Sequence, residues 1–258
     1  MLPSSLKPAV EERLQAAGCV AADEEADEMV RRAPDRAMLE AWVERRSGGE
    51  PLAWIVGSVT FCGLEVAVHP GIYVPRPQTE ELARRAAQLL PSGGRAADLC
   101  CGSGAVARYL WAEAAGAAVV AADIDPRATR CARTNGVPAV TCDLGAALRP
   151  GEFDLVSAVA PYVPSASIRF LPPDVQRFEP RRALDGGVDG LDVALRVVVA
   201  ASMLLRPGGW LVVEVGGEQD RGLAPALEAA GFGRAEAWRD DEGDLRGLAA
   251  RLAGTGRS

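Results

Sequence analysis

The first 50 residues carry apolar side chains at helical spacing. The pattern around Trp42 predicts one helix, which Gly48 ends, and the same spacing favours two earlier helices at residues 5–17 and 21–32. Three short helices bury little apolar surface by themselves. We therefore predict a small helical substrate-recognition domain at residues 1–50 that docks on a larger domain or on a substrate.

Residues 51–77 follow a different pattern. Runs rich in β-branched and aromatic residues, at 54–57 and 59–61 and then at 64–68, flank a turn at residues 62–63, which is typical of a β-hairpin. A proline-rich stretch follows, and we expect it to be extended because proline disfavours helix in the residue before it. Thr79 is placed to cap the next helix. The segment is predicted to be a β-hairpin linker.

From residue 96 onward, short apolar runs alternate with helical stretches. This alternation indicates a sheet of parallel strands with helices packed on its faces. The expected strands are 96–100, 118–123, 139–143, 153–159 and 210–215, and two more near 235–239 and 245–250 would close the sheet. We therefore predict an α/β, Rossmann-like domain of seven strands over residues 78–258.

The first of these strands leads through a glycine turn into a helix. Gly102 and Gly104 lack a Cβ atom, so the backbone there can approach a ligand closely and adopt positive φ. The helix that follows directs unpaired N–H groups at the same place. Asp123 ends the next apolar run, at about the offset of ~20 residues from Gly102 at which a carboxylate reaches ribose hydroxyls. The arrangement predicts an adenosine cofactor.

The glycine turn also fits the dinucleotide motif G-x-G-x-x-G/A, which is a weak signal alone. Asp98 favours S-adenosylmethionine instead, because its carboxylate can accept hydrogen bonds from the methionine ammonium and would repel a pyrophosphate. Asp143, at the end of the third strand, suits the adenine amino group. A dinucleotide domain has no need of Ala160, Pro161 and Tyr162 after the fourth strand. Loop capping is the alternative role for the carboxylates.

Composition excludes several other functions. The chain has 28 Lys and Arg against 35 Asp and Glu, a net charge of −7, which argues against a nucleic-acid partner. Its six cysteines form no C-x-x-C pair, and His69 alone cannot complete a zinc site, so we expect no metal and reduced, buried thiols. The absence of a bilayer-length apolar run and of a signal peptide predicts a cytoplasmic protein without a membrane partner.

Several motifs together resemble the HemK-type protein-(glutamine-N5) methyltransferases. The run P-R-P-Q-T-E at 75–80 follows the family signature P-R-P-E-T-E. Residues 98–104 fall on the family loop D-x-G-x-G-S-G, with Cys100 in place of the first glycine. Further similar runs lie at 49–57, 61–63, 179–181 and 184–191. The resemblance covers most of the chain, and the combination is far more specific than any one motif.

The resemblance implies methyl transfer from S-adenosylmethionine to a glutamine side-chain amide, in the Gly-Gly-Gln motif of a peptide chain release factor. The residues expected to bind the cofactor are Asp98, Cys100, Gly102, Gly104, Asp123, Ile124, Asp143 and Val159. The expected catalytic residues are Ala160, Pro161 and Tyr162, and the expected substrate-binding residues are Arg76, Pro77 and Tyr162. Arg76 has one alternative, an ion pair with Glu80 on the solvent side.

The chain departs from the family at the target motif N-P-P-Y, where Val159 stands in place of asparagine. In the family, the asparagine carboxamide orients the acceptor amide, and losing one such contact costs on the order of 10²–10³ in rate by analogy with an oxyanion-hole donor. Three hypotheses stay open for this divergent branch. In the first, the protein methylates the same amide weakly, and the Ala160 carbonyl and the Tyr162 ring hold the substrate. In the second, it methylates a different acceptor, a small-molecule or nucleic-acid amine. In the third, it binds the cofactor without turnover.

Two side-chain roles have structural alternatives. Tyr162 is expected to form a wall of the acceptor pocket, although an aromatic residue after a strand is often simply packed. Cys100, Cys101 and Cys142 are expected to line the pocket as small buried side chains, because no activating base lies near them in the sequence.

Overall fold

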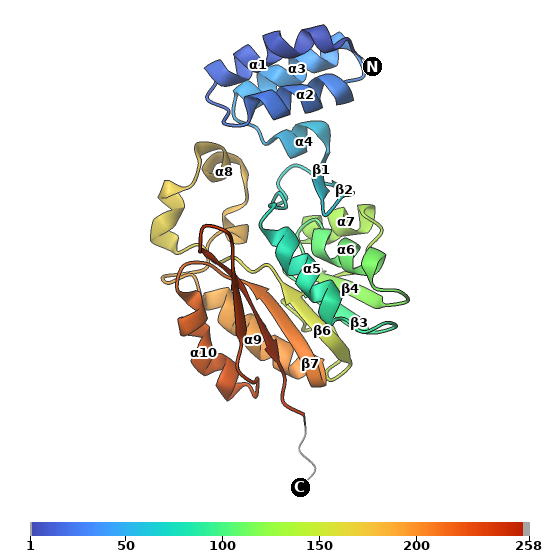
Figure 1. Ribbon diagram of the computed structural model, residues 1–258, viewed down its shortest axis with the longest axis vertical. Helices are drawn as coiled ribbons and strands as arrows, with labels where there is room; N and C mark the ends of the chain where they lie inside the picture. Colours follow the sequence, from blue (N-terminus) through green and yellow to red (C-terminus); the bar gives the residue numbers. More distant parts are fainter. Residues whose placement is uncertain (1, 255–258) are drawn as a thin grey trace.

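The computed structural model describes residues 2–254, and its centre is one seven-stranded sheet (Figure 1). The strands are β3 (Arg95–Leu99), β4 (Ala118–Asp123), β5 (Ala139–Thr141), β6 (Phe153–Ala158), β7 (Leu205–Glu214), β8 (Glu236–Arg239) and β9 (Leu245–Arg251). They lie in the order β5-β4-β3-β6-β7-β9-β8. Strand β9 runs antiparallel to both of its neighbours, and the other adjacent pairs are parallel. The predicted seven-stranded α/β fold is confirmed, with a mixed rather than a parallel sheet.

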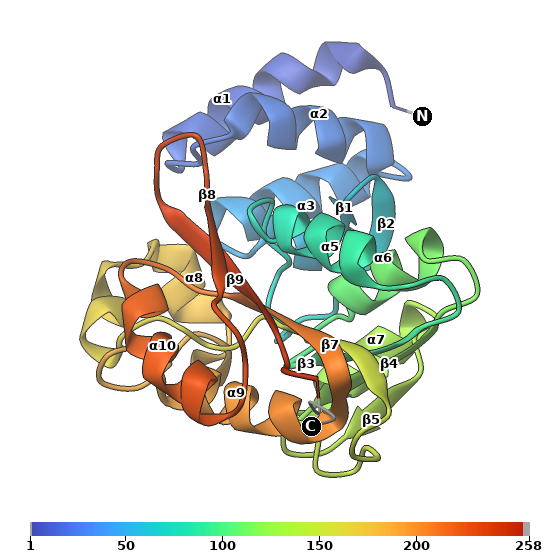
Figure 2. The same ribbon diagram turned by 60° about the horizontal axis from the view of Figure 1, so that its bottom comes forward.

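Helices cover both faces of the sheet (Figures 1 and 2). One face packs against α5 (Thr79–Leu89), α6 (Ala105–Glu113) and α7 (Pro126–Thr134). The other packs against α9 (Asp192–Leu204) and α10 (Gln219–Ala229). The strands between them are continuous apolar runs because both of their faces are buried; every residue of β6 is buried, for example.

The strand order reverses direction at β3 and β6, the two strands at the centre of the sheet. The chain leaves β3 toward β4 on one side, whereas β6 continues to β7 on the other. In open α/β sheets, ligands bind outside the carboxyl ends of the strands at such a switch point, because the two departing loops leave a crevice there. The glycine turn after β3 and residues 159–162 after β6 meet at this place.

Three helices form a separate small core at the N-terminal end, seen at the top of Figure 1. They are α1 (Lys7–Ala16), α2 (Ala22–Arg32) and α3 (Arg36–Ser47). The sequence predicted all three. Leu14, Met29 and Leu39 are almost completely buried between them. Helix α3 begins where the Asp35 side chain accepts a hydrogen bond from the Met38 N–H group at 2.8 Å, which satisfies one of the unpaired donors of the first turn.

The run 54–56 is helical, so its prediction as part of a strand was wrong. It belongs to α4 (Leu52–Val56), which follows Pro51 and ends at Gly57 with φ of 86°. A helix places neighbouring apolar residues on different faces: Ile55 packs into the N-terminal core, while the Trp54 indole N–H donates to the Ile72 carbonyl at 2.9 Å. Helix α4 thus joins the N-terminal core to the rest of the chain.

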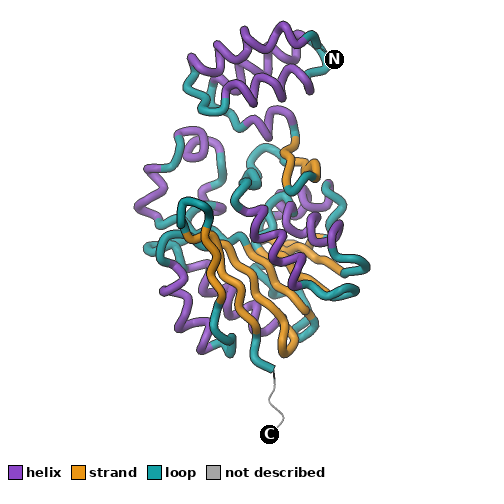
Figure 3. The backbone as a smooth tube through the Cα atoms, in the orientation of Figure 1, coloured by secondary structure: helices purple, strands orange, loops and turns teal. Residues whose placement is uncertain are grey.

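The predicted hairpin is confirmed in its second part (Figure 3). Strands β1 (Ser58–Phe61) and β2 (Leu64–Ala67) pair antiparallel, with Phe61 opposite Leu64. Both residues of the loop, Cys62 and Gly63, have positive φ, which suits the right-handed twist of the strands. Among residues 2–254, no helix combines the length and apolar composition needed to cross a bilayer.

Candidate active site

A cavity of about 360 Å³ lies at the carboxyl ends of β3, β4 and β6, at the switch point. Of the predicted site residues, its lining includes Asp98, Cys100, Gly102, Asp123, Ile124, Asp143, Val159 and Pro161. Predicted residues outside this lining are Gly104, Ala160, Tyr162, Arg76 and Pro77. The fold therefore brings most of the expected cofactor residues together in one place.

Asp98 is the most deeply buried carboxylate of the cavity, with 1% of its surface exposed. One of its oxygens accepts a hydrogen bond from the Ser157 hydroxyl on β6 at 2.8 Å. The other oxygen has no hydrogen-bond partner among the described residues. Burial raises the pKa of Asp98 to about 7, although the Ser157 hydroxyl and the nearby Ala107 N–H group both lower it. A buried, unpartnered carboxylate oxygen in a cavity fits a cationic ligand group.

Asp123, at the end of β4, is held by two backbone groups. One oxygen accepts from the Gly102 N–H group at 2.9 Å and the other from the Asp125 N–H group at 2.8 Å. Burial raises its pKa, and these two hydrogen bonds oppose the rise. Because each carboxylate oxygen can accept more than one bond, Asp123 keeps capacity for ligand hydroxyls. Within the protein, the bond from Asp123 to Gly102 holds the glycine turn against the end of β4.

The two glycines of the turn differ in role. Gly102 has φ of 54°, and a Cβ atom there would meet no protein atom within 4 Å, so its missing side chain leaves the cavity open. A Cβ on Gly104 would lie 2.8 Å from the Cβ of Ala132 on α7. Gly104 therefore permits close helix packing. Cys100, just before the two glycines, is also left-handed, with φ of 55°, a conformation that costs a non-glycine residue roughly 1–2 kcal/mol.

Asp143 faces solvent as well as the cavity. Its carboxylate pairs with Arg196 of α9 at 2.6 Å, and both side chains are about half exposed, at 50% and 55%. Such an exposed pair is weak, so Asp143 is free to exchange Arg196 for a ligand donor. Cys142 is absent from the cavity lining, contrary to expectation, because its thiol turns to the Leu144 carbonyl at 3.0 Å.

Of the four site residues expected after β6, two line the cavity. Val159 and Pro161 line it, whereas Ala160 is almost completely buried behind them. The Tyr162 ring packs beside Gly216, and its hydroxyl faces Glu214 and Gln78. Burial raises the pKa of that phenol. Tyr162 thus lies outside the cavity lining and packs beside Gly216, while Pro161 contributes to the lining.

Arg76 makes a partly buried ion pair, and its partner is neither a ligand nor the alternative Glu80. Its guanidinium pairs with Glu179 and lies 4.9 Å from the ring centre of Tyr73. The Glu179 side chain is 1% exposed, and burial raises its pKa against the opposing charge of Arg76. The alternative pairing with Glu80 is wrong, because Glu80 pairs with Arg84 one helical turn away. Arg76 thus fastens the segment before α5 to the segment before α9.

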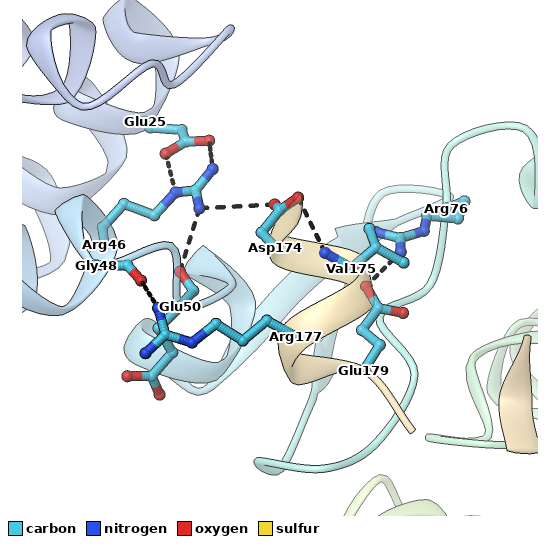
Figure 4. Close-up of polar contacts among 9 residues, drawn as sticks. All are labelled: Glu25, Arg46, Gly48, Glu50, Arg76, Asp174, Val175, Arg177 and Glu179. Atoms are coloured by element: carbon cyan, nitrogen blue, oxygen red, sulfur yellow. Dashed lines mark hydrogen bonds and ion pairs between the residues drawn. The ribbon is translucent and has the colours of Figure 1, made fainter. Parts of the chain in front are cut away.

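That second segment, residues 164–183, contacts the N-terminal core (Figure 4), and its last residues line the cavity. It contains helix α8 (Pro173–Phe178) and no fully buried residue within its helices. Arg177 donates to the Gly48 carbonyl at 3.3 Å, and Asp174 lies 3.8 Å from Arg46. Arg46 itself is bound to Glu25 at 2.5 and 2.9 Å.

The end of α8 continues directly into the cavity lining. Phe178 packs edge-on against Trp54 of α4 at a ring separation of 6.3 Å. Pro180, Arg182 and Ala183 follow and line the cavity. The contacts of α8 therefore connect the N-terminal core to the wall of the candidate site.

Sequence reasoning missed several buried polar residues around the site. Glu214 ends β7 with 2% of its surface exposed, next to Tyr162 and Thr79. Thr79 was expected to cap α5, but it is the first helical residue, and its buried hydroxyl faces Glu214. Gln219 starts α10 and binds three separate loops. The only available signal was a polar residue within or beside a strongly apolar strand.

Comparison with known proteins identifies the family. Residues 97–167 match a family model described as a methyltransferase domain. The release factor glutamine methyltransferase of Geobacter sulfurreducens is 37% identical over 202 residues, 76% of this chain and 71% of that protein. The protein of the same name in Rhodospirillum rubrum is 38% identical over 240 residues, 90% of this chain and 74% of the relative. The chain belongs to the release factor glutamine methyltransferase family.

Solved structures agree on the fold. The complex of Mtq2 and Trm112 from E. cuniculi, described as methylating the eRF1 termination factor, gives a TM-score of 0.54 at 22% identity, covering 71% of this chain and 99% of that one. The T. thermophilus 16S rRNA methyltransferase RsmC, solved with AdoMet and guanosine, gives 0.52 at 20% identity, covering 77% and 45%. At these identities the likeness concerns the fold alone.

As a member of this family, the protein is a methyltransferase whose methyl donor is S-adenosylmethionine. The described residues fit that cofactor. The unpartnered Asp98 oxygen suits its ammonium group, and the open space beside Gly102 admits a ligand at the start of α6. Most of the remaining cavity lining is apolar, as expected of a small-molecule site.

Proposed function

We propose that this protein methylates the side-chain amide nitrogen of a glutamine in a protein, a peptide chain release factor being the favoured substrate. The observation that carries the proposal is the combination of family membership with a cavity in which Asp98, Asp123 and Val159 lie at three central strand ends. The relatives named above are release factor glutamine methyltransferases, and this chain spans about three quarters of their length.

We assign the cofactor contacts as follows. Asp98 accepts the ammonium group, Asp123 the ribose hydroxyls and Asp143 the adenine amino group, while Ile124 supplies apolar contact. Gly102 leaves room for the cofactor, and Cys100 and Val159 form the walls beside it. When bound, S-adenosylmethionine supplies an electrophilic methyl group on a sulfonium, so the protein has only to bind and orient the acceptor and exclude water.

The acceptor contacts are proposed for the segment after β6. Residues 159–161 lie beyond Ala158, the last residue of β6 paired in the sheet, so their backbone groups have no ladder partners on β3 or β7. An amide nitrogen is a poor nucleophile, and its positioning is most of the catalysis available. With Val159 in place of asparagine, the backbone carbonyl of Ala160 takes that task, with Pro161 as the flat wall against the acceptor.

The chain divides accordingly. We assign residues 1–50 to acceptor recognition, 51–77 to the linker and 78–258 to catalysis. Arg76 and Pro77 act at the junction of the last two, where Arg76 is bound to Glu179. The net charge of −7 supports a protein acceptor over a nucleic acid, since nucleic-acid binding depends on neutralising phosphates.

The test is a transfer assay with methyl-labelled S-adenosylmethionine. The protein is incubated with purified release factor and, separately, with the same factor carrying Ala in place of the Gly-Gly-Gln glutamine. We expect label in the first factor only, located by mass spectrometry on the glutamine. Asp98→Asn is the enzyme control.

Two outcomes would replace the proposal. Label entering nucleic acid or a small molecule of a cell extract, and not the release factor, would show a different acceptor. Tight cofactor binding without any labelled product would show a protein without turnover. The second outcome would follow from Val159, which has no carboxamide to orient the acceptor.

A further inference from the structure

Gln219 occupies a junction between three loops. It is the first residue of α10, and only 8% of its surface is exposed. Its side-chain oxygen accepts from the Gly216 N–H group at 3.0 Å. Its side-chain nitrogen lies 2.9 Å from the Tyr162 carbonyl, 3.2 Å from the Gly190 carbonyl and 3.3 Å from the Asp189 carbonyl. Both the oxygen and the nitrogen of this buried carboxamide therefore bind backbone groups.

One of the three loops reaches the cavity, because Val159 and Pro161, in the segment that contains Tyr162, line it. Tyr162 belongs to the segment after β6, and Gly216 to the loop after β7. Gly190 lies just before α9. Only the amides Asn and Gln carry an acceptor oxygen and a donor NH₂ group on the same side chain, and of these only glutamine has the length found here.

Close backbone packing shows that this junction is built without free space. A Cβ atom on Gly190 would collide with the Tyr162 carbonyl oxygen and with the Gln219 nitrogen. A Cβ on Gly186 would lie 2.6 Å from the Pro161 carbonyl oxygen. The loop before α9 therefore passes directly against the backbone of residues 161 and 162, and Gln219 closes the remaining side.

A short ladder fixes the residue after Tyr162. The Val163 N–H group donates to the Leu184 carbonyl and the Val163 carbonyl accepts from Gly186, both at 2.9 Å. With Val163 fixed there and Tyr162 fixed by Gln219, the direction in which the chain leaves β6 is determined. The cavity wall formed by Val159 and Pro161 follows from that direction.

We propose that Gln219 is a positioning residue for the methyl acceptor, which acts by fixing the Tyr162 carbonyl and thereby the backbone of residues 159–161. This proposal rests on the proposed function for the identity of the acceptor. It has particular weight in this chain because Val159 offers no side-chain hydrogen bond to an amide. The backbone alone orients the acceptor, so its geometry determines the rate.

The test is Gln219→Glu, which keeps the shape of the side chain and the acceptor for Gly216. It replaces the donor NH₂ with an oxygen facing three carbonyl oxygens. We expect kcat to fall at least tenfold and the dissociation constant of S-adenosylmethionine to stay within twofold of the wild type. The neighbouring Glu218→Gln, whose side chain is 79% exposed, is the matched control and should leave both values unchanged.

A pH series separates positioning from general damage. The carboxyl group of Q219E lies in a buried site beside carbonyl oxygens, which raises its pKa. Below that pKa it is protonated and donates one hydrogen bond again. The deficit in kcat, taken as a ratio to the wild type at each pH, should therefore shrink from pH 8 to pH 6. The ratio cancels the titration of groups that both proteins share.

Amide hydrogen exchange gives a readout independent of the acceptor. With saturating S-adenosylmethionine, we expect faster exchange at residues 159–163 and 186–191 of Q219E and no change in β3 or β4. Unchanged exchange and unchanged kcat would overturn the proposal, as would a loss of cofactor affinity equal to the loss of kcat.

If wild-type protein does not methylate a release factor, the proposed function fails, while the exchange result still decides the role of Gln219. If Q219E does not fold, Gln219→Met removes the hydrogen bonds without placing a charge. The same measurements then apply to that variant.

Discussion

Asp98 places a carboxylate where the protein itself cannot fully satisfy it. Its folded pKa of about 7 lies above the ordinary value of 3.8, so the folded protein holds a proton that the unfolded chain releases. The stability that this group contributes is present at low pH and is lost as pH rises through about 7. A cationic ligand offsets the loss of stability at higher pH, because it pairs with the ionised carboxylate.

We predict a pH-dependent cofactor affinity as a result. Below pH 7 the dissociation constant of S-adenosylmethionine should rise about tenfold per pH unit, because Asp98 must first lose its proton, and an α-amino group with a pKa of ~8 stays charged there. Calorimetry between pH 5.5 and 7 measures this. Asp98→Asn should bind at least about tenfold more weakly at pH 7.5, as expected for loss of a charged hydrogen bond, and should lose the pH dependence.

Ser157 provides the control for that assignment. Its hydroxyl lowers the pKa of Asp98, so Ser157→Ala should move the midpoint of the affinity profile to higher pH without abolishing it. A profile that stays in place in S157A, or that persists in D98N, would assign the titration to another group.

Val159 marks the second residue-scale prediction. Val159→Asn restores a carboxamide at the cavity wall, and we expect faster glutamine methylation of a release factor, by up to on the order of 10²–10³. The initial rate of label transfer measures it. Val159→Thr, which keeps the side chain's branched shape, is the control and should gain much less. No gain in V159N would mean that the acceptor pocket differs at further positions.

At the scale of elements, strands were easier to predict than short helices. Central strands are continuous apolar runs bounded by turns, and β4 was predicted with its observed bounds. The run 54–56 shows the limit: a short apolar run does not distinguish a strand from a buried helix. The deciding signals were Pro51 before the first turn and Gly57 in the left-handed conformation after the last.

The candidate site was predictable where its residues follow strands. Asp98, Asp123 and Val159 do so, and each lines the cavity. The ion pair of Arg76 with Glu179 joins residues 103 positions apart, and Gln219 contacts Tyr162 across 57. Such contacts depend on how loops fold back over the sheet, which the local sequence does not predict.

Helix α8 allows a prediction at this scale. Asp174→Asn together with Arg177→Met removes its polar contacts to α3 and to the Gly48 carbonyl without leaving a buried charge. The Arg177 bond is exposed and the Arg46–Asp174 pair is long, at 3.8 Å. Weak contacts of this kind contribute up to about 1 kcal/mol, so KM for the protein acceptor should rise about fivefold. Cofactor affinity should stay within twofold.

Steady-state kinetics at saturating cofactor measures the effect of the α8 variant. Arg169→Met alters an exposed arginine of the same segment and should behave as wild type. Unchanged KM in the double variant, with faster amide exchange in α8, would show that this helix does not contribute to acceptor binding.

For the whole molecule, the central cavity connects cofactor binding to stability. A ligand at 100 times its dissociation constant stabilises the folded state by about 2.7 kcal/mol. For a chain of this size that corresponds to a rise of about 5–10 °C in the unfolding temperature. We expect this shift with S-adenosylmethionine and none with NAD. A scanning fluorimetry series measures both, and a shift with NAD alone would contradict the cofactor assignment.

The bridge formed by α8 has a kinetic consequence. Pro180, Arg182 and Ala183 line the cavity immediately after this helix, and the helix contacts the N-terminal core. From the proposed role of that core in acceptor recognition, we expect a bound acceptor to hold the bridge in place, so that the spent donor leaves only after the methylated acceptor has departed. Turnover is therefore expected to be ordered, with the cofactor the first reactant to enter and the last product to leave. Product-inhibition patterns would show the demethylated cofactor competing with S-adenosylmethionine alone.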